Sequence, residues 1–307
     1  MDVKVFWTII SVPNNYWRRY ALRHVLWHTE ASAFKHCFLV NPTPYTLDEQ
    51  KAHADLCLSA HSHRGYDTVV KTLEQMRKLH HAYDYYIFSD DDAFVDIKTL
   101  RQDLALFRQN FVHTNLVYGS IEWSSIDVNT GSMQGWGYSP SSALRAIKTK
   151  WHSSLVGPFP FMKGPCFVFG DDIMGDLLRL AVPALKAIQS RREILVDIFF
   201  GYVMAGVRDI NVVDMGRDLV EARLNHKLCE NCRVLHMNKR HSTRMAERQN
   251  ISMYTLFRKT AQRALQPISK MRIDCETPPF WHKQFYRDMF PTFQLPLGRN
   301  WSWCVLR

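Results

Sequence analysis

Three consecutive aspartates, Asp90, Asp91 and Asp92, interrupt an apolar run in the stretch "YYIFSDDDAFVD". Carboxylates packed this closely repel one another, so they need a counter-charge. A divalent metal is the strongest candidate, because hard oxygen ligands suit Mn²⁺ or Mg²⁺. In an extended segment Asp90 and Asp92 point to the same side of the chain, so that one can bind metal while the other orders a ligand. The alternative is a solvated acidic turn that caps the next helix.

The chain before the triplet alternates between strand-like and helix-like patterns. Strands are predicted at residues 3–12, 36–40 and 84–89, and helices at 17–27 and 66–82. This alternation predicts an α/β fold, a single domain with a mostly parallel sheet flanked by helices. Ligands bind beyond the carboxyl ends of the strands in such sheets. The triplet follows the third strand directly, where chemistry is expected.

The chain after the triplet continues the alternation less regularly. A helix with Ile97, Leu100, Leu104 and Phe107 on one face and a strand at residues 115–123 are predicted. The polar, turn-rich residues 124–150 are interpreted as a mobile loop near the site. A helix is expected from about Asp171, with Asp171 or Asp172 as its N-cap, and another from near Asp197.

Composition and charge limit the classes of function. The 307 residues are 46% apolar, which is ample for a sizeable core, and the formal charge of +10 favours an anionic partner. No nucleic-acid-binding motif accompanies the charge, so no nucleic-acid partner is expected. The apolar run at residues 5–12 is too short to span a bilayer. Membrane association is therefore expected only through an N-terminal anchor that this sequence does not include.

Cysteines, sequons and histidine pairs remain open to several interpretations. Cys229 and Cys232 form a single CxxC, which indicates a redox motif, members of disulfides or ordinary cysteines. Asn250 and Asn300 begin N-x-S sequons, which are glycosylation acceptors in a secretory lumen. The pair "HH" at residues 80–81 lies on the predicted helix at adjacent positions, which cannot chelate from one face. It is interpreted as a surface pair.

The stretch "YYIFSDDDAFVD" resembles the DxD segment of the inverting β-1,3-glycosyltransferases. That family contains β-1,3-galactosyltransferases, β-1,3-N-acetylglucosaminyltransferases and Fringe. Further blocks are similar to the family's and follow in its order: "RRYALRHVLW", "GYDTVVKT", "KTKWHSSLVGPFPFMKGPCFVFGDDIM", "LVDIFFGYVMAGV" and "RVLHMNKRHSTRMAERQN". The resemblance covers most of residues 3–250.

The resemblance implies a GT-A-like, Rossmann-type fold and a catalytic domain at residues 1–250. Residues 251–307 then form a basic and aromatic extension packed on the same domain. The implied activity is metal-dependent, inverting transfer of galactose or N-acetylglucosamine from a UDP-sugar to a hydroxyl of an acceptor glycan, glycoprotein or glycolipid. The implied linkage is β-1,3, and the implied location is the Golgi lumen.

The resemblance also implies roles for individual residues. Asp92 and His236 bind Mn²⁺ (or Mg²⁺) together with Asp90, while Asp90 and Asp91 contact the ribose or metal-bound water. Asp197 is the general base, because inversion by direct displacement requires one carboxylate to take the acceptor's proton. It also opens an apolar helical run, and capping that helix is compatible with catalysis. Arg19, Arg23 and Lys71 are candidates for the nucleotide's anionic side, with surface solubility as the alternative. Gly164 is a candidate for close backbone approach to a sugar, with an ordinary turn glycine as the alternative.

Two departures from the family pattern support an alternative function. Val196 replaces an acidic residue, and Cys166 replaces the second glycine of its block. The alternative is a catalytically inactive relative that binds glycan or assists a partner enzyme. The presence of Asp90, Asp92, Asp197 and His236 together favours the enzyme, because an inactive protein has no need for all four.

Overall fold

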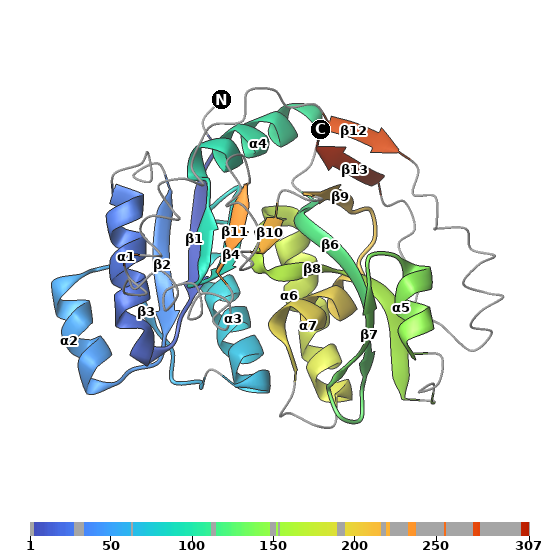
Figure 1. Cartoon of the computed structure of the whole chain (residues 1–307), viewed down its shortest axis with the longest axis horizontal. Coiled ribbons are helices and arrows are strands. Elements are labelled where there is room, and N and C mark those ends of the chain that lie inside the picture. The colour runs from blue at the N-terminus through green and yellow to red at the C-terminus, as the bar shows by residue number, and fades with distance from the viewer. Residues whose placement is uncertain are drawn as a thin grey trace.

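The computed structural model describes most of the chain up to residue 237 and short segments beyond it (Figure 1). The described residues are 3–27, 34–62, 64–111, 115–147, 152, 154–188, 194–215, 219–221, 233–237, 255, 273–276 and 302–306. Cys229, Cys232 and the sequon residues Asn250 and Asn300 lie outside these ranges, so the predictions for them stay predictions.

Within the described ranges, ten strands form one mixed sheet with a central antiparallel strand. Its order is β12 (Ile273–Glu276), β13 (Ser302–Leu306), β9 (Asn211–Asp214), β6 (Leu116–Asp127), β8 (Leu155–Gly170), β4 (Tyr85–Asp90), β1 (Val5–Ile10), β2 (Lys35–Val40) and β3 (Leu56–Leu58), with β7 (Met133–Gly137) paired to β6. The ladders β4–β1–β2–β3 and β6–β9–β13 are parallel. The long strand β8 joins these halves, because it runs antiparallel to both β4 and β6.

Helices cover both faces of the sheet, as the predicted α/β class requires. They are α1 (Tyr16–Trp27), α2 (Pro44–Ala52), α3 (Gly65–Leu79), α4 (Ile97–Asn110), α5 (Pro140–Ile147), α6 (Asp171–Ala187) and α7 (Val196–Met204). Alternate residues of β4 enter two different cores, since successive side chains of a strand point to opposite faces. Tyr85 and Ile87 pack with α1 and α4, whereas Tyr86 and Phe88 pack with α3, α6 and α7. The predicted α/β fold with helices on both faces is confirmed.

A second, three-stranded sheet lies beside the carboxyl end of β4. It consists of β10 (Leu219–Glu221), β11 (Val234–His236) and β5 (Ala93–Val95). β5 follows the aspartate triplet directly and pairs antiparallel with β11, with His236 opposite Ala93. The small sheet therefore brings a late segment of the chain to the triplet.

The interpretation of residues 124–150 as a mobile loop is wrong. β6 continues to Asp127, β7 returns antiparallel to it, and α5 follows. The serines that suggested a loop lie inside the sheet: Ser124 and Ser125 are fully buried, and the Ser124 hydroxyl donates to the Gly135 carbonyl. Small polar residues mark loops only when they are solvated, and here the partner strand β7 accepts the hydrogen bond of the buried Ser124 hydroxyl.

The N-cap predicted for the helix after residue 170 is also displaced. Gly170 occupies the N-cap position, and Asp171 is the first residue of α6. The Asp171 side chain bonds instead to the backbone N–H of His81 and to the Tyr86 hydroxyl. It thus ties the start of α6 to the end of α3 rather than capping its own helix.

Two strands of the C-terminal region belong to the main sheet. β13 pairs parallel with β9, and β12 pairs antiparallel with β13. Most of residues 251–307 lie outside the described ranges, so the predicted boundary at residue 250 stays a prediction. Among the described residues, no helix combines the length and the apolar character needed to cross a membrane.

Candidate active site

The triplet lies at the carboxyl end of β4, where the chain turns from the main sheet into the small sheet. β4 runs parallel to β1, with Asp90 opposite Ile10. The Asp91 N–H donates to the Ile10 carbonyl at 3.1 Å, and the Met237 N–H donates to the Asp92 carbonyl at 2.8 Å. Backbone bonds on both sides therefore hold the three carboxylates in one place.

Asp91 anchors the triplet to the segment between β1 and α1. Its carboxylate, 4% exposed, accepts bonds from Ser11 Oγ at 2.6 Å, Asn15 Nδ2 at 2.8 Å and Arg18 Nη1 at 2.7 Å. A carboxylate satisfied by three donors has little capacity left for a ligand. The predicted contact of Asp91 with ribose or metal-bound water stays untested, and its position indicates an anchoring role.

Asp92 and His236 are neighbours, as the predicted metal pair requires. Asp92 Oδ1 lies 3.4 Å from His236 Nε2, and Asp92 Oδ2 lies 3.1 Å from Arg18 Nη1. Burial opposes ionisation of Asp92, but His236 and Arg18 outweigh it and lower the pKa of this carboxyl. His236 Nδ1 is buried and makes no hydrogen bond with the described residues. Asp92 is therefore held ionised beside an imidazole.

Asp197 lies in the first turn of α7 and faces the backbone of β8. Its Oδ2 accepts a bond from the Gly164 N–H at 3.1 Å, and its Oδ1 accepts one from its neighbour Ile198 N–H at 2.9 Å. Burial raises the pKa of Asp197 to about 6, although these N–H groups favour the charged form. A carboxyl with such a pKa takes up protons near neutral pH, as a general base must.

Gly164 separates Asp197 from Asp90. A Cβ added at residue 164 would lie 3.3 Å from Asp197 Oδ2 and 3.7 Å from Asp90 Oδ2. Burial, together with the charges of Asp92, Asp91 and Asp197, raises the pKa of Asp90 well above its usual range. The glycine backbone thus lies between two carboxyls that disfavour each other's ionisation.

Asp90, Gly164 and Asp197 line one pocket of about 280 Å³. The remaining lining is mainly apolar and comes from β1, α3, β8 and the start of α7: Ile10, Gly65, Thr68, Phe167, Ile194, Leu195 and Val196. Val196, where the family pattern has an acid, therefore faces the same space as Asp197. A pocket that is mostly apolar and contains a few converging polar groups has the usual character of a small-molecule site.

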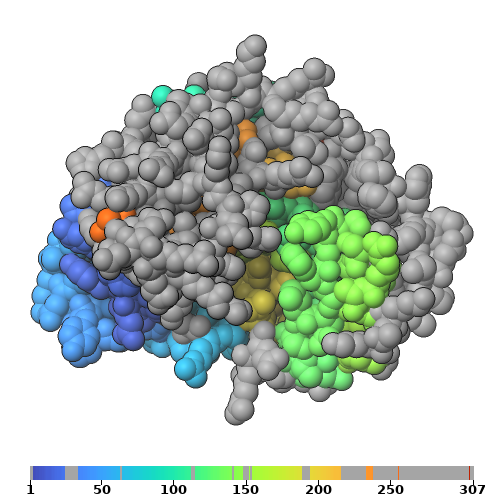
Figure 2. Space-filling view, in the orientation of Figure 1, coloured from blue at the N-terminus to red at the C-terminus, as the bar shows by residue number. Residues whose placement is uncertain are grey.

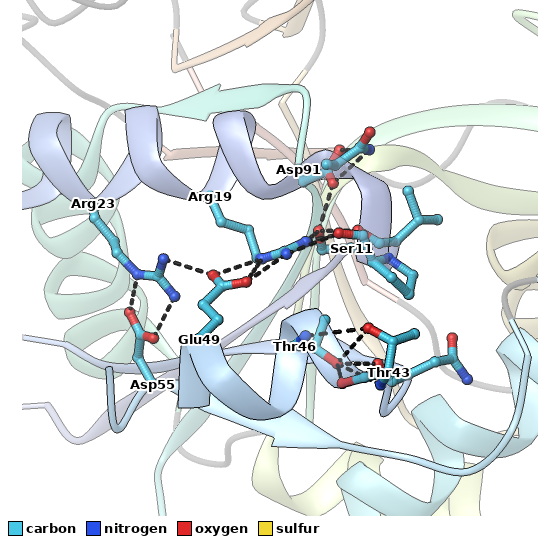
Figure 3. Close-up of polar contacts among 12 residues, drawn as sticks. Ser11, Arg19, Arg23, Thr43, Thr46, Glu49, Asp55 and Asp91 are labelled. Carbon is cyan, nitrogen blue, oxygen red and sulfur yellow. Dashed lines mark hydrogen bonds and ion pairs between the residues drawn. The ribbon is translucent and has the colours of Figure 1, made fainter. Parts of the chain in front are cut away.

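Arg19 and Arg23 do not reach this pocket, which corrects their predicted role at the nucleotide. Both side chains are fully buried between α1 and α2 (Figure 3). Glu49 accepts bonds from Arg19 Nη2 at 2.6 Å and from Arg23 Nη1 at 2.7 Å, and Asp55 accepts a further pair from Arg23. Arg19 contacts the triplet only indirectly, because its Nη1 donates to Ser11, which bonds to Asp91.

Lys71 lies on the inner face of α3, three residues beyond the pocket-lining Thr68. Its side chain is fully buried, and desolvation lowers the pKa of Lys71 to about 7, although the charges of Asp67 and Asp91 oppose the shift. Lys71 is therefore close enough to the triplet to interact with it electrostatically. Its predicted role at the anionic side of a nucleotide stays a prediction.

Arg18 is the site residue that the sequence reasoning missed. It bridges Asp91 and Asp92, whereas its neighbour Arg19 faces α2. Both arginines occur in the block "RRYALRHVLW", so the block itself was the available signal. Adjacent residues on a helix point about 100° apart, and only the packing of α1 decides which arginine meets the carboxylates.

Glu122, a buried carboxylate, is another residue near the site that the sequence did not single out. Its Oε2 accepts a bond from Trp136 Nε1 at 2.5 Å, and its Oε1 lies 3.4 Å from Lys163 Nζ. The charge of Glu122 also contributes to the raised pKa of Asp197. The Trp136 ring is exposed and contacts the exposed ring of Tyr138, with the two ring centroids 5.4 Å apart. Figure 2 shows the segment around β7 and α5 at the surface on this face of the molecule.

Comparisons with known proteins give matches by structure only. No protein-family model matches the sequence, and no curated protein matches it. The apo structure of the WbbM bifunctional glycosyltransferase shares 13% identity and a TM-score of 0.43, and it covers 86% of this chain and 45% of that one. A CMP:2-keto-3-deoxy-manno-octonic acid synthetase complexed with CTP shares 12% identity over 58% of this chain and 78% of that one, with a TM-score of 0.35.

S. aureus TarS 1-349 in complex with UDP-GlcNAc shares 16% identity, with a TM-score of 0.28. The match covers 38% of this chain and 34% of the TarS chain. The present chain thus spans less than half the length of the WbbM and TarS chains. These likenesses concern the arrangement of the backbone and assign no activity to this protein.

Proposed function

We propose that this protein is a metal-dependent, inverting glycosyltransferase. It transfers galactose or N-acetylglucosamine from a UDP-sugar to a hydroxyl of an acceptor glycan and forms a β-1,3 linkage. The proposal is carried by one observation: Asp197, with a pKa of about 6, shares a pocket with Asp90 beside the Asp92–His236 pair. A base and a candidate metal site therefore lie together near the carboxyl end of β4.

The residues present fit a hard divalent cation. Carboxylate oxygens of Asp90 and Asp92 with one imidazole nitrogen of His236 form a donor set that Mn²⁺ accepts and that Mg²⁺ accepts less readily. The three aspartates also concentrate negative charge that Arg18 alone does not balance. When bound there, the cation supplies neutralisation of the charge that develops on a departing diphosphate.

The chain's own residues supply the remaining chemistry. Asp197 takes the proton of the acceptor hydroxyl, and the N–H groups of Gly164 and Ile198 keep its carboxylate aimed during the transfer. The apolar side chains of Ile10, Phe167 and Ile194 exclude water, which favours transfer to the acceptor over hydrolysis of the donor. A direct displacement that inverts the anomeric carbon needs one catalytic carboxylate, and Asp197 is that group.

The acceptor side of the proposal rests on the exposed aromatic pair. Trp136 and Tyr138 are 44% and 73% exposed, and Trp136 is tied to the buried Glu122. Aromatic rings with one polar handle suit surfaces that are apolar on one side and wet on the other, as the faces of a sugar ring are. The pair therefore receives the acceptor glycan, with Glu122 close enough to Asp197 to influence its charge.

The first experiment measures UDP binding by calorimetry with and without Mn²⁺. The wild type is expected to bind UDP only with Mn²⁺, and Asp92→Ala is expected to lose that binding. Asp176→Ala serves as the control, because Asp176 is a partly exposed carboxylate on α6 paired to Arg179 away from the pocket. Donor screening with UDP-galactose and UDP-N-acetylglucosamine follows. Absence of UDP binding under every condition would leave the inactive relative as the better account.

The acceptor surface is tested separately from the donor site. Tyr138→Ala is expected to raise KM for the acceptor several-fold and to leave KM for the UDP-sugar unchanged. Tyr45→Ala is the matched control, because Tyr45 is 84% exposed on the remote helix α2. Equal kinetics for the two variants would remove Tyr138 from the acceptor surface without affecting the donor proposal.

The disulfide bonds of this protein support its placement in an oxidising compartment. Cys37 and Cys57 form a disulfide between β2 and β3, and Cys304 is also disulfide-bonded. Structural disulfides persist in secreted and lumenal proteins and are rare in the cytosol. We therefore place the protein in the secretory pathway, with the Golgi lumen as the compartment that the family resemblance implies. Localisation of the tagged full-length protein by microscopy tests this placement.

A further inference from the structure

His80, His81 and Asp171 converge at the end of β4 that is opposite the aspartate triplet. His80 and His81 follow the last residue of α3, and Asp171 is the first residue of α6. The Asp171 N–H donates to the Asp84 carbonyl, just before β4 begins, whereas Asp90 ends that strand. None of the three residues lines the pocket of the candidate active site.

The backbone brings both imidazoles to one side. The prediction that these histidines lie on a helix is wrong, because α3 ends at Leu79, whereas their interpretation as surface residues holds for the exposed His81. His80 has extended ψ (φ −50°, ψ 135°), and His81 lies in the left-handed region with φ 66°. The two rings consequently stack, with centroids 3.7 Å apart and planes inclined by 28°. The ring nitrogens of the two adjacent histidines can then reach the same ion, which an uninterrupted helix would prevent.

The ligand atoms are close enough to share one ion. His81 Nδ1 lies 3.0 Å from Asp171 Oδ2, and His80 Nε2 lies 4.0 Å from Asp171 Oδ1. One ligand atom from each of the three residues lies within 4.8 Å of the other two. A tetrahedral zinc site needs donor atoms a little over 3 Å apart, given Zn–N and Zn–O bonds of about 2.0–2.2 Å. His80 Nε2 and Asp171 Oδ1, which lie 4.0 Å apart, must therefore come closer by side-chain rotation when the ion binds.

Neighbouring groups hold the cluster in shape. The Asp171 carboxylate accepts bonds from the His81 backbone N–H at 2.9 Å and the Tyr86 hydroxyl at 2.8 Å. Gly175, one turn into α6, makes room for His80, since a Cβ there would lie 3.1 Å from His80 Cε1 and Nε2. Ligating carboxylates and imidazoles are typically oriented by such outer contacts.

We propose that His80, His81 and Asp171 bind a divalent transition-metal ion, Zn²⁺ first, which cross-links the end of α3 to the start of α6. Two imidazole nitrogens and one carboxylate oxygen form a donor set that suits zinc better than Mn²⁺ or Mg²⁺. Water completes the coordination. The ion has a structural role, because the cluster is remote from the pocket and pins two helices that pack on the same core.

The test compares zinc binding by wild type and His81→Gly. Glycine adopts the left-handed conformation of residue 81 readily, so this variant removes a ligand and keeps the turn. His61→Ala is the matched control, because His61 pairs with the Glu74 carboxylate at 3.1 Å and belongs to no three-residue metal-ligand cluster among the described residues. Urea unfolding without metal verifies that each variant is folded.

Calorimetry with Zn²⁺ and absorption spectroscopy with Co²⁺ give the readouts. His81→Gly is expected to bind one zinc ion fewer, or to bind it at least about 100-fold more weakly, and to lose the zinc-induced rise in Tm. His61→Ala and Asp92→Ala are expected to keep that ion and that rise. Unchanged zinc stoichiometry and Tm response in His81→Gly would overturn the proposal, as would loss of the same ion in Asp92→Ala.

Discussion

Asp197 combines two properties of a general base at the level of a single residue. It lines the pocket, and burial raises its pKa to about 6 while two backbone N–H groups orient it. An ordinary surface aspartate would be ionised at neutral pH but would be too weak a base to accept a hydroxyl proton efficiently. The raised pKa therefore makes Asp197 a stronger base that is still mostly ionised at pH 7.

A base acts only in its ionised form, so activity should fall as the pH drops below about 6. The kcat/KM of the wild type should lose about tenfold per pH unit below this value. Asp197→Asn should lower kcat by about 10²–10⁴-fold at neutral pH and leave UDP binding intact. Steady-state kinetics across pH 4.5–8 measure both effects, with Asp172→Asn on α6 as a control carboxylate. An active Asp197→Asn variant would remove Asp197 from catalysis.

Arg18 supplies a positive charge directly beside the triplet. It is 7% exposed and contacts both Asp91 and Asp92. Removing one partner of a buried ion pair leaves the other charge uncompensated, which typically costs about 3–5 kcal/mol of stability. A metal ion at Asp92 would supply part of the missing charge.

Arg18→Gln should therefore lower the free energy of unfolding by about 3 kcal/mol without metal. Saturating Mn²⁺ should restore part of this loss, so the Mn²⁺-induced rise in Tm should be larger than in the wild type. Arg179→Gln is the matched control, because the Arg179–Asp176 pair is exposed on α6 and exposed pairs contribute little. Equal Mn²⁺ responses in the two variants would show that Arg18 does not balance the metal site.

At the level of elements, buried ion pairs hold α1 against α2. Glu49 on α2 lies between Arg19 and Arg23 of α1, and Asp55 continues the series (Figure 3). Burial opposes ionisation of Glu49, but the two guanidinium groups lower the pKa of its carboxyl. The network positions the N-terminal half of α1, which carries Arg18 to the triplet.

Glu49→Ala should lower the free energy of unfolding by about 3–5 kcal/mol, because it removes the carboxylate that pairs with the buried Arg19 guanidinium and leaves Arg23 paired with Asp55 alone. Asp48→Ala on the same helix should change it by less than about 1 kcal/mol, since its pair with Lys51 is exposed. Urea unfolding measures both. Similar losses for the two variants would show that the buried network adds nothing beyond a surface pair.

The pH dependence of this network has a defined sign. The pKa of Glu49 is lower in the folded protein than its ordinary value of 4.5. Its contribution to stability is therefore fully present above about pH 4.5 and is lost as the pH falls through the folded value. The stability difference between wild type and Glu49→Gln should accordingly shrink below pH 4.5.

At the level of the whole molecule, a covalent link secures one edge of the sheet. The Cys37–Cys57 disulfide joins β2 to β3 across a sequence separation of 20 residues. The Gln75 amide of α3 donates to Cys37 Sγ, which connects this edge to the helix that lines the pocket. A loop of this length corresponds to about 3 kcal/mol of stabilisation in the chain-entropy treatment.

The double variant Cys37→Ser/Cys57→Ser should lose about 3 kcal/mol of unfolding free energy under oxidising conditions. Reductant should make the difference in unfolding free energy between wild type and variant smaller, since it removes the disulfide from the wild type alone. A gap that persists in reductant would come from side-chain packing. No gap under oxidising conditions would contradict the prediction.

The sequence by itself determined the local features of the fold. Strongly periodic segments such as residues 66–82, 84–89 and 97–107 predicted α3, β4 and α4, because their apolar spacing depends only on the chain's own geometry. The position of the triplet at the carboxyl end of β4 followed from the same pattern. The resemblance to the inverting β-1,3-glycosyltransferases implied Asp92, His236 and Asp197 as candidate site residues.

Only the tertiary structure decided which of these residues meet. Pairing of β11 with β5 brings His236 to Asp92, and packing of α1 turns Arg18 rather than Arg19 toward the triplet. Residues 124–127 and 133–137 became paired strands, and the helix α5 followed them, because pairing with a partner strand supplied hydrogen bonds such as that of the Ser124 hydroxyl. The histidines after α3 converged on Asp171 because the helix ended at Leu79. Each of these outcomes depends on contacts between distant parts of the chain, which no local spacing encodes.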